Sequence, residues 1–152
     1  MDIAGQIQNT PLRTLYAYWA GKKGARLAPR RSDIDPAEMK NFLRYVFLLD
    51  IVDIPLRFRF RLAGTEIVSR YGEEVTGRFL DEIDLDDVGS EILNEYETAV
   101  REARPVRGHW QYTKRDGQYL KYERIILPLS SDGHSIDMLL CGACMDLMSA
   151  SR

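Results

Sequence analysis

The 152-residue chain lacks several features that whole classes of protein require. It has two cysteines and two histidines, which give no zinc-ligand spacing. It has no apolar run long enough to span a membrane, and its formal net charge of −2 gives no electrostatic signature for nucleic acid or a lipid surface. Residues 1–6 also lack the basic and apolar regions of a signal peptide. We therefore expect a cytoplasmic protein with no nucleic-acid or membrane partner.

The sequence also lacks the motifs of common catalytic sites. There is no Gly-x-Ser-x-Gly elbow and no glycine-rich phosphate loop. Cys141-Gly-Ala-Cys144 has the spacing of a redox pair, but that chemistry needs a helix N-terminus, and this segment reads as a strand. Residues an odd number apart in a strand face opposite sides. We predict two unreactive thiols, no catalytic residue, no metal site and no enzymatic activity.

The length fits a single domain with an adequate hydrophobic core. We expect a flexible tail at residues 1–9, one folded domain at 10–147 and a second tail at 148–152.

Thr10-Pro11 is a typical helix start. Leu12, Leu15, Tyr16 and Trp19 then form one apolar stripe at helical spacing. A stripe of about three turns is unstable alone, so it must pack on its own sheet or pair with a second copy. Because tryptophan and tyrosine dominate binding hot spots, we take this stripe as the first candidate for a homodimer or partner interface.

The central region predicts two adjacent strands followed by short helices. Residues 45–52 form an apolar run that suits a buried strand, and residues 57–62 alternate arginine with an apolar residue, as expected of an edge strand. Asp35-Pro36 predicts a helix that runs to about Leu43. Short helical turns are expected at residues 66–71 and 80–85.

The remaining sequence predicts a longer helix and three strands. The helix begins near Asp86 or Asp87 and ends before Pro105. Strands follow at 106–115, 118–129 and 136–147, and Asp116-Gly117 is a strong hairpin signal between the first two. The whole order predicts an α+β fold with one antiparallel sheet.

Four separate motifs, in this order along the chain, closely resemble a family of stand-alone bacterial PAS proteins, chiefly alphaproteobacterial. They are Tyr18-Trp19, then Pro29-Arg30-Arg31 with Asp33-Ile34-Asp35-Pro36, then residues 60–65 (Phe-Arg-Leu-Ala-Gly-Thr), then Tyr71-Gly72 with Thr76-Gly77. The resemblance implies a five-stranded sheet in the order 2-1-5-4-3, with helices and a ligand-sized pocket on one face. It also implies an N-terminal helix that covers the other face or mediates dimerisation. It implies sensing or protein interaction, and no reaction.

We expect the helix-covered pocket to hold a small apolar or aromatic ligand, if any, and no fixed cofactor. The candidate lining residues are mostly aromatic or aliphatic: Phe79, Leu80, Ile92, Tyr96, Trp110, Tyr112, Ile126 and Leu139. The leading hypothesis is therefore a non-enzymatic regulatory module that acts through an unidentified protein partner or as a homodimer.

Three alternatives stay open. A small cone-like α+β enzyme would need an Asp or Glu facing the cavity. A haem sensor would need an axial ligand such as His109, whereas the flavin photochemistry of PAS relatives is excluded because residues 76–80 contain no cysteine. Nucleic-acid binding would use Arg57, Arg59 and Arg61 together with a basic connector formed by Lys22, Lys23, Arg26, Arg30 and Arg31.

Overall fold

The computed structural model describes residues 3–52, 55–83, 85, 88–113 and 115–148. Five strands form one antiparallel sheet in the order β2-β1-β5-β4-β3, which confirms the predicted topology. The strands are β1 (Val46–Val52), β2 (Arg57–Ala63), β3 (Val106–Thr113), β4 (Tyr119–Leu129) and β5 (Met138–Met148), and the helices are α1 (Thr10–Lys23), α2 (Thr65–Tyr71) and α3 (Gly89–Glu102).

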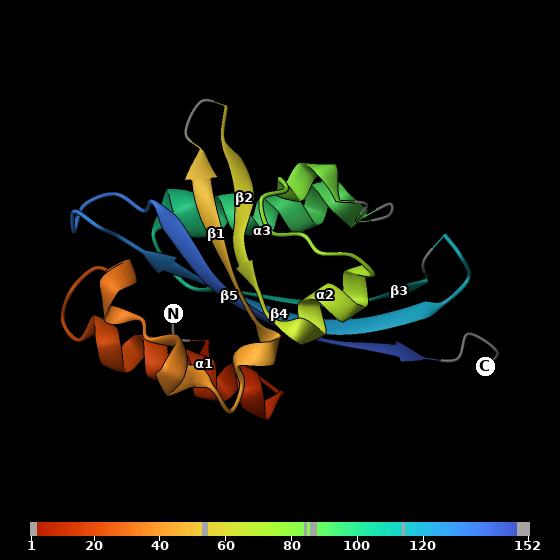
Figure 1. The fold of residues 1–152 in the computed structure, drawn as a ribbon, viewed down its shortest axis with the longest axis horizontal. Helices are drawn as coiled ribbons and strands as arrows, with labels where there is room; N and C mark the ends of the chain where they lie inside the picture. The colour runs from red at the N-terminus through yellow and green to blue at the C-terminus, as the bar shows by residue number, and fades with distance from the viewer. Residues whose placement is uncertain (1–2, 53–54, 84, 86–87, 114, 149–152) are drawn as a thin grey trace.

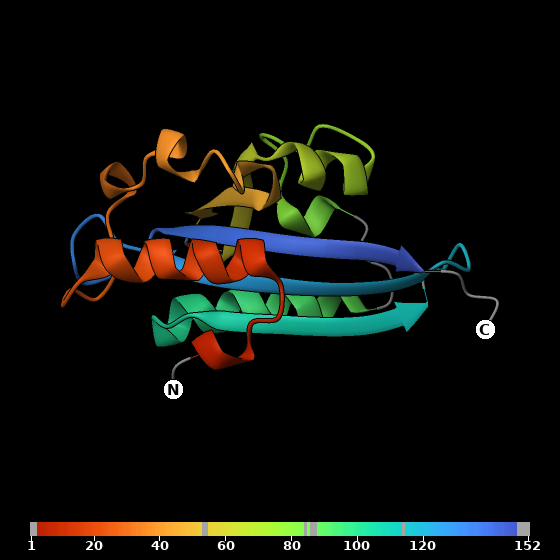
Figure 2. The ribbon, with the colours of Figure 1, turned by 90° about the horizontal axis from the view of Figure 1, so that it is seen from below.

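The sheet is covered on both faces (Figures 1 and 2). Helix α1 and the turns before β1 lie on one face, which we call the outer face, and α2 and α3 lie on the other, the inner face. Successive strand residues point to opposite faces, so the described core divides into two apolar clusters. Cys141 belongs to the inner cluster and Cys144 packs against the outer one. The predicted opposite orientation of the two thiols is confirmed.

Strand β2 lies at one edge of the sheet, as the arginine alternation predicted. Its buried residues Phe58 and Phe60 face the inner cluster. Arg57 pairs with Asp81 at 2.7 Å and Arg61 with Asp50 at 2.9 Å. The exposed arginine face is thus engaged by carboxylates of the same chain.

Helix α1 packs directly on β5. A Cβ placed on Gly142 would lie 2.7 Å from a methyl carbon of Leu15 and 2.8 Å from one of Leu12, so only glycine allows this close approach. Trp19 is also buried, and its Nε1–H donates a hydrogen bond to the Pro128 carbonyl at 2.8 Å. The apolar stripe therefore packs on its own sheet.

One local expectation differs from the structure, and another falls on residues outside the described ranges. Residues 36–43 do not form one helix but the 3-10 turn Pro36–Met39, followed by a separate turn at Leu43–Tyr45. Phe42 lies between the two turns and donates its backbone N–H to the Met39 carbonyl at 2.9 Å, and both side chains reach the outer cluster. The expected start of the long helix at Asp86 or Asp87 lies outside the described residues.

The N-terminal segment also differs from expectation. Residues 3–9 are not loose: Ala4–Gln6 form a 3-10 turn, and Ile3 and Ile7 are buried in the outer cluster. Apolar side chains at both ends of the turn favour the packing of this segment against the sheet. The sequence did not indicate this packing, because the segment shows no hydrophobic period. Within the part of the chain that the structure describes, no helix is long and apolar enough to cross a membrane.

Candidate functional site

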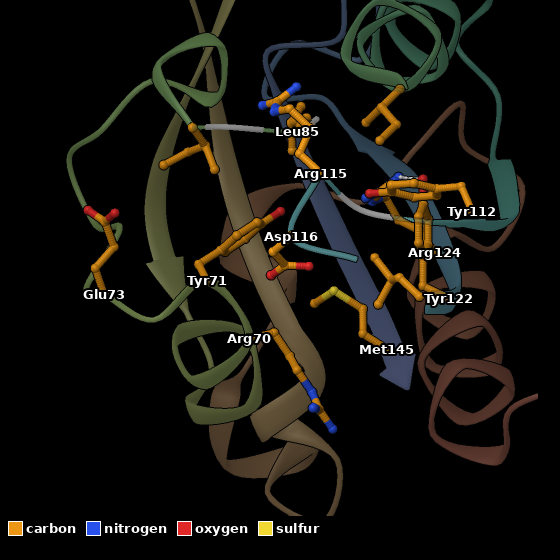
Figure 3. Close-up of a pocket in the computed structure, with 13 residues that line it drawn as sticks. Arg70, Tyr71, Glu73, Leu85, Tyr112, Arg115, Asp116, Tyr122, Arg124 and Met145 are labelled. Atoms are coloured by element: carbon orange, nitrogen blue, oxygen red, sulfur yellow. Dashed lines mark hydrogen bonds between the residues drawn. The ribbon is translucent and has the colours of Figure 1, made fainter. Parts of the chain in front are cut away.

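A cavity of about 340 Å³ lies between the inner face of the sheet, α2 and α3 (Figure 3). In the figure, Arg70 and Tyr71 from α2 lie on one side and Tyr112, Tyr122 and Arg124 on the other. The complete lining combines aliphatic, aromatic and charged side chains: Arg70, Tyr71, Glu73, Ile83, Leu85, Ile92, Tyr112, Arg115, Asp116, Leu120, Tyr122, Arg124 and Met145.

The structure brings only two of the eight predicted pocket residues, Ile92 and Tyr112, to this cavity. Four others, Leu80, Tyr96, Ile126 and Leu139, are fully buried in the inner cluster and fill the space that the prediction left open. Large apolar side chains at the centre of a sheet pack against one another at near-crystalline density. The cavity therefore lies toward the β3–β4 hairpin, where polar side chains replace apolar ones.

Phe79 and Trp110 also have structural partners. The Arg57 guanidinium carbon lies 3.7 Å from the centroid of the Phe79 ring. The indole Nε1–H of Trp110 donates a hydrogen bond of 2.7 Å to Glu95 Oε2. Neither residue lines the cavity.

The charged residue Arg124 is the main departure from the apolar pocket that the sequence predicted. It is only 3% exposed and projects from β4 into the inner layer. Its guanidinium carbon lies 4.6 Å from the ring centroid of Tyr122 and 5.3 Å from that of Tyr96, within cation–π range. Burial alone would lower the pKa of Arg124, but the surrounding tyrosines and Glu95 raise it, so this buried guanidinium stays charged.

Glu95 of α3 is the carboxylate partner of Arg124. Its Oε1 lies 3.3 Å from a terminal nitrogen of Arg124, while Oε2 accepts the hydrogen bond from Trp110. Gly108, which is paired with Arg124 across β3 and β4, leaves the space that the Glu95 carboxylate occupies. A glycine, a carboxylate and an arginine from three elements thus form one structural unit beside the cavity.

Two polar atoms near this unit lack a partner. Among the buried side-chain nitrogens and oxygens of the described residues, only Tyr96 Oη and Arg124 Nε accept or donate no hydrogen bond. Burial raises the pKa of Tyr96 well above its ordinary value, so its hydroxyl is protonated and can donate. Unpaired buried polar atoms are costly, and in native proteins they commonly mark a bound water or ligand group.

Acidic residues also border the cavity, which bears on the enzyme alternative. Glu73 and Asp116 both line it, but both are exposed. Glu73 forms an ion pair with Arg78, and Asp116 Oδ1 accepts a hydrogen bond from the Gln118 backbone at 3.0 Å. A general acid or base normally needs a perturbed environment. Both are surface carboxylates that already have partners in this chain. No group of three or more potential metal ligands is found in the described ranges.

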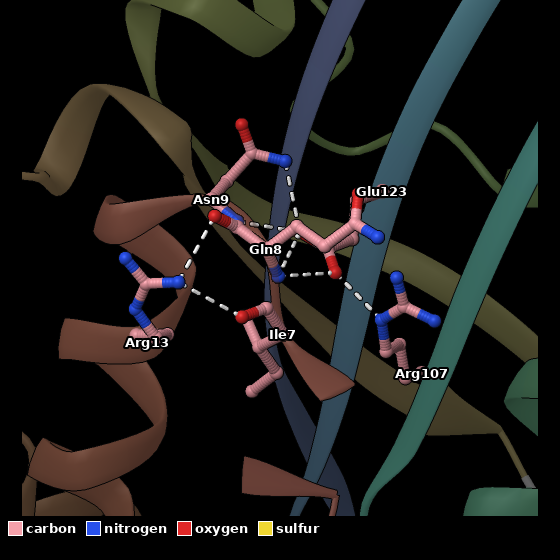
Figure 4. Close-up of polar contacts among 6 residues, drawn as sticks. All are labelled: Ile7, Gln8, Asn9, Arg13, Arg107 and Glu123. Carbon is pink, nitrogen blue, oxygen red and sulfur yellow. Dashed lines mark hydrogen bonds and ion pairs between the residues drawn. The ribbon is translucent and has the colours of Figure 1, made fainter. Parts of the chain in front are cut away.

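The outer face carries a second buried charge, Glu123 of β4, which is 1% exposed (Figure 4). Its carboxylate accepts hydrogen bonds from the backbone N–H groups of Gln8 and Asn9, each at 2.9 Å, and from Arg107 Nε at 2.6 Å. Burial alone would raise the pKa of Glu123, but these donors together lower it. Glu123 thus fixes the segment that leads into α1.

The candidate interface residues on α1 are mostly buried. Leu12, Leu15 and Trp19 are buried under the outer face and Tyr16 packs beside them, so the predicted interface stripe is not a free surface. Packing on its own sheet is the first of the two arrangements that the sequence allowed, and a role of the stripe in an interface stays a prediction.

The cysteines and His109 also lie away from any reactive arrangement. Both cysteines are free, and burial raises the pKa of Cys144 to about 12 and that of Cys141 further. His109 is exposed and borders a small depression beside Glu123, remote from the main cavity because it faces the other side of β3 from Trp110 and Tyr112. The haem hypothesis therefore finds no ligand of this kind in the cavity.

Three solved structures share this fold. A light-oxygen-voltage domain studied with a flavin analogue matches at a TM-score of 0.55 and 14% identity, over 74% of this chain and 83% of that chain. The LOV protein of Rhodobacter sphaeroides matches at 0.52 and 12% identity, over 78% and 70%. VqmA bound to DPO matches at 0.55 and 14% identity, over 74% and 58%.

The sequence itself matches the PAS domain family over residues 7–144. The chain therefore belongs to this family, a family of sensory domains, as the motifs in the sequence predicted. No match was found among curated proteins.

Proposed function

We propose that this protein is a non-enzymatic, cytoplasmic PAS module that binds a small molecule in the inner cavity and transmits its presence through protein contacts. Family membership supports the sensory role. The size of the cavity supports a small ligand, since 340 Å³ lies at the lower end of the range for small-molecule sites. A ligand would act by binding one of two conformations more tightly than the other.

The observation that carries this proposal is the polar group inside the cavity. Arg124 is buried, charged and incompletely hydrogen-bonded where it borders the space. A pocket with apolar walls and a few fixed polar groups is typical of ligand recognition. A residue kept only for stability could be replaced by an apolar one, because buried ion pairs add little net stability.

Since most of the α1 stripe is buried, the proposed output contact uses another surface. Of the large apolar side chains in the described ranges, only Leu27 is exposed, at 38%. A contact with a second copy or another protein therefore uses a largely polar surface. The segment before α1 is well placed to respond, because Glu123, which holds it, is the neighbour of Arg124 on β4.

Native mass spectrometry of the protein purified from its own cells tests the proposal. We expect the wild-type protein to carry the additional mass of a small molecule. The control is Arg124→Met prepared in the same way, which should lack this mass. Light scattering on the same samples reports whether the number of protein copies in the assembly changes when the small molecule is bound. A wild-type protein that retains no small molecule, in any growth condition tested, would contradict the proposed function.

A further inference from the structure

The geometry points to a small aromatic carboxylate as the ligand of the inner cavity. This inference rests on the proposed function and names the chemical class that the site recognises.

The first step is the incomplete pairing of Arg124. Glu95 contacts one terminal nitrogen at 3.3 Å, and the same nitrogen lies 3.3 Å from Tyr122 Oη, which are long distances for charge-assisted contacts. The Nε–H has no acceptor. An arginine offers its donors in a planar fork that matches a carboxylate. Of the donors of this fork, the buried Nε–H is therefore unused, and Arg124 itself lines the cavity.

The second step is the unpaired hydroxyl of Tyr96, which does not line the cavity but whose ring centroid lies 5.3 Å from the guanidinium carbon of Arg124. Tyr96 Oη and Arg124 Nε can both donate, so the group that satisfies them is an acceptor. A charged acceptor forms hydrogen bonds about twice as strong as a neutral one. A carboxylate is therefore favoured over a carbonyl at this position.

The third step is the shape and chemistry of the walls. Tyr112 and Tyr122 lie edge to face with centroids 6.5 Å apart, and Met145, Leu120 and Ile92 line the same space. Methionine sulfur and tyrosine rings both make favourable contacts with aromatic groups. The volume of about 340 Å³ accommodates one or two fused rings with a short acid side chain.

Isothermal titration with matched probes tests this assignment. The probes are phenylacetate and 1-naphthylacetate, each compared with its neutral amide. We expect at least one acid to bind at least about tenfold more tightly than its amide, which corresponds to the extra strength of the charged hydrogen bond. An amide that binds as tightly as its acid would overturn the carboxylate assignment.

Tyr96→Phe provides a variant that keeps the packing. It removes a hydroxyl that has no partner, so the unliganded protein should melt roughly 2–4 °C higher while its affinity for the acid falls several-fold. Tyr119→Phe is the matched control, because the Tyr119 hydroxyl bonds to Gln111 on the surface and its removal should leave affinity unchanged. Arg124→Met should abolish the preference for acid over amide.

The results separate this inference from the proposed function. A small molecule retained from cells that proves neutral, or an unaltered acid affinity in Tyr96→Phe and Arg124→Met, would overturn the carboxylate assignment alone. The absence of both a retained molecule and acid binding would overturn the inference and the proposed function together.

Discussion

Replacing Gly108 by alanine tests whether β3 makes room for the carboxylate that neutralises Arg124. A Cβ at this position would lie 2.7 Å from the carboxylate carbon of Glu95, so the Glu95 side chain would have to move. Its movement would break both the 2.7 Å hydrogen bond from Trp110 and the 3.3 Å contact with Arg124. Loss of one partner of a buried pair costs about 3–5 kcal/mol. Because Glu95 can turn toward solvent, we expect Gly108→Ala to lower the free energy of unfolding by about 2–4 kcal/mol.

The control is the same substitution in a Glu95→Ala background. There the added methyl group meets no carboxylate, and alanine in a strand costs no more than glycine, so Gly108→Ala should change stability by less than about 0.5 kcal/mol. Urea denaturation of the four proteins, followed by circular dichroism, gives the coupling energy. An equal cost of Gly108→Ala in both backgrounds would refute the steric reasoning.

Three further predictions concern the outer face and the cysteines. Glu123→Gln should cost about 2–4 kcal/mol at pH 7, because a buried charged acceptor is lost. Since the pKa of Glu123 is lowered in the folded state, its contribution is present above its unfolded pKa of about 4.3 and is lost as the pH falls through its folded pKa; the wild-type advantage in urea denaturation should therefore shrink below about pH 4. Trp19→Phe should destabilise the chain by about 1–3 kcal/mol without changing its mass in light scattering; a change of oligomer would show that the stripe does contact a partner. Cys141 and Cys144 should react with a disulfide reagent at pH 8 only after unfolding, and rapid labelling of either in native protein would contradict their burial.

The fold was predictable because the strongest local signals agree with the tertiary structure. The arginine alternation at 57–62 became an edge strand, and Asp116-Gly117 became the hairpin between β3 and β4. Weaker signals failed where burial overrode them. Ile3 and Ile7 are too few to show a period, yet both are buried, and Asp35-Pro36 begins a 3-10 turn where a longer helix was predicted.

The site was less predictable because its main residue is buried although it is charged. The prediction selected apolar residues, and those mostly fill the core. The signal it missed was Arg124, which shares one face of a central strand with Leu120, Tyr122 and Ile126. A charged residue on the same strand face as core residues is buried unless it lies near the end of the strand. A buried arginine at such a position needs a carboxylate partner from another element. Glu95 supplies it across 29 positions of sequence, and only the fold brings the two together.

The two buried charges of β4 connect the outer and the inner face of the sheet. Glu123 and Arg124 are adjacent, so they must face opposite sides of the sheet. Each is almost completely buried, and neither can lose its partner without leaving an uncompensated charge in the interior. Any change that draws Arg124 toward a group in the cavity acts on the same short length of backbone that positions Glu123. The hydrogen bonds that hold Gln8 and Asn9 are the first contacts on the outer face to feel it. Under the proposed function, this adjacency is the route by which we expect ligand binding in the cavity to reach the N-terminal surface.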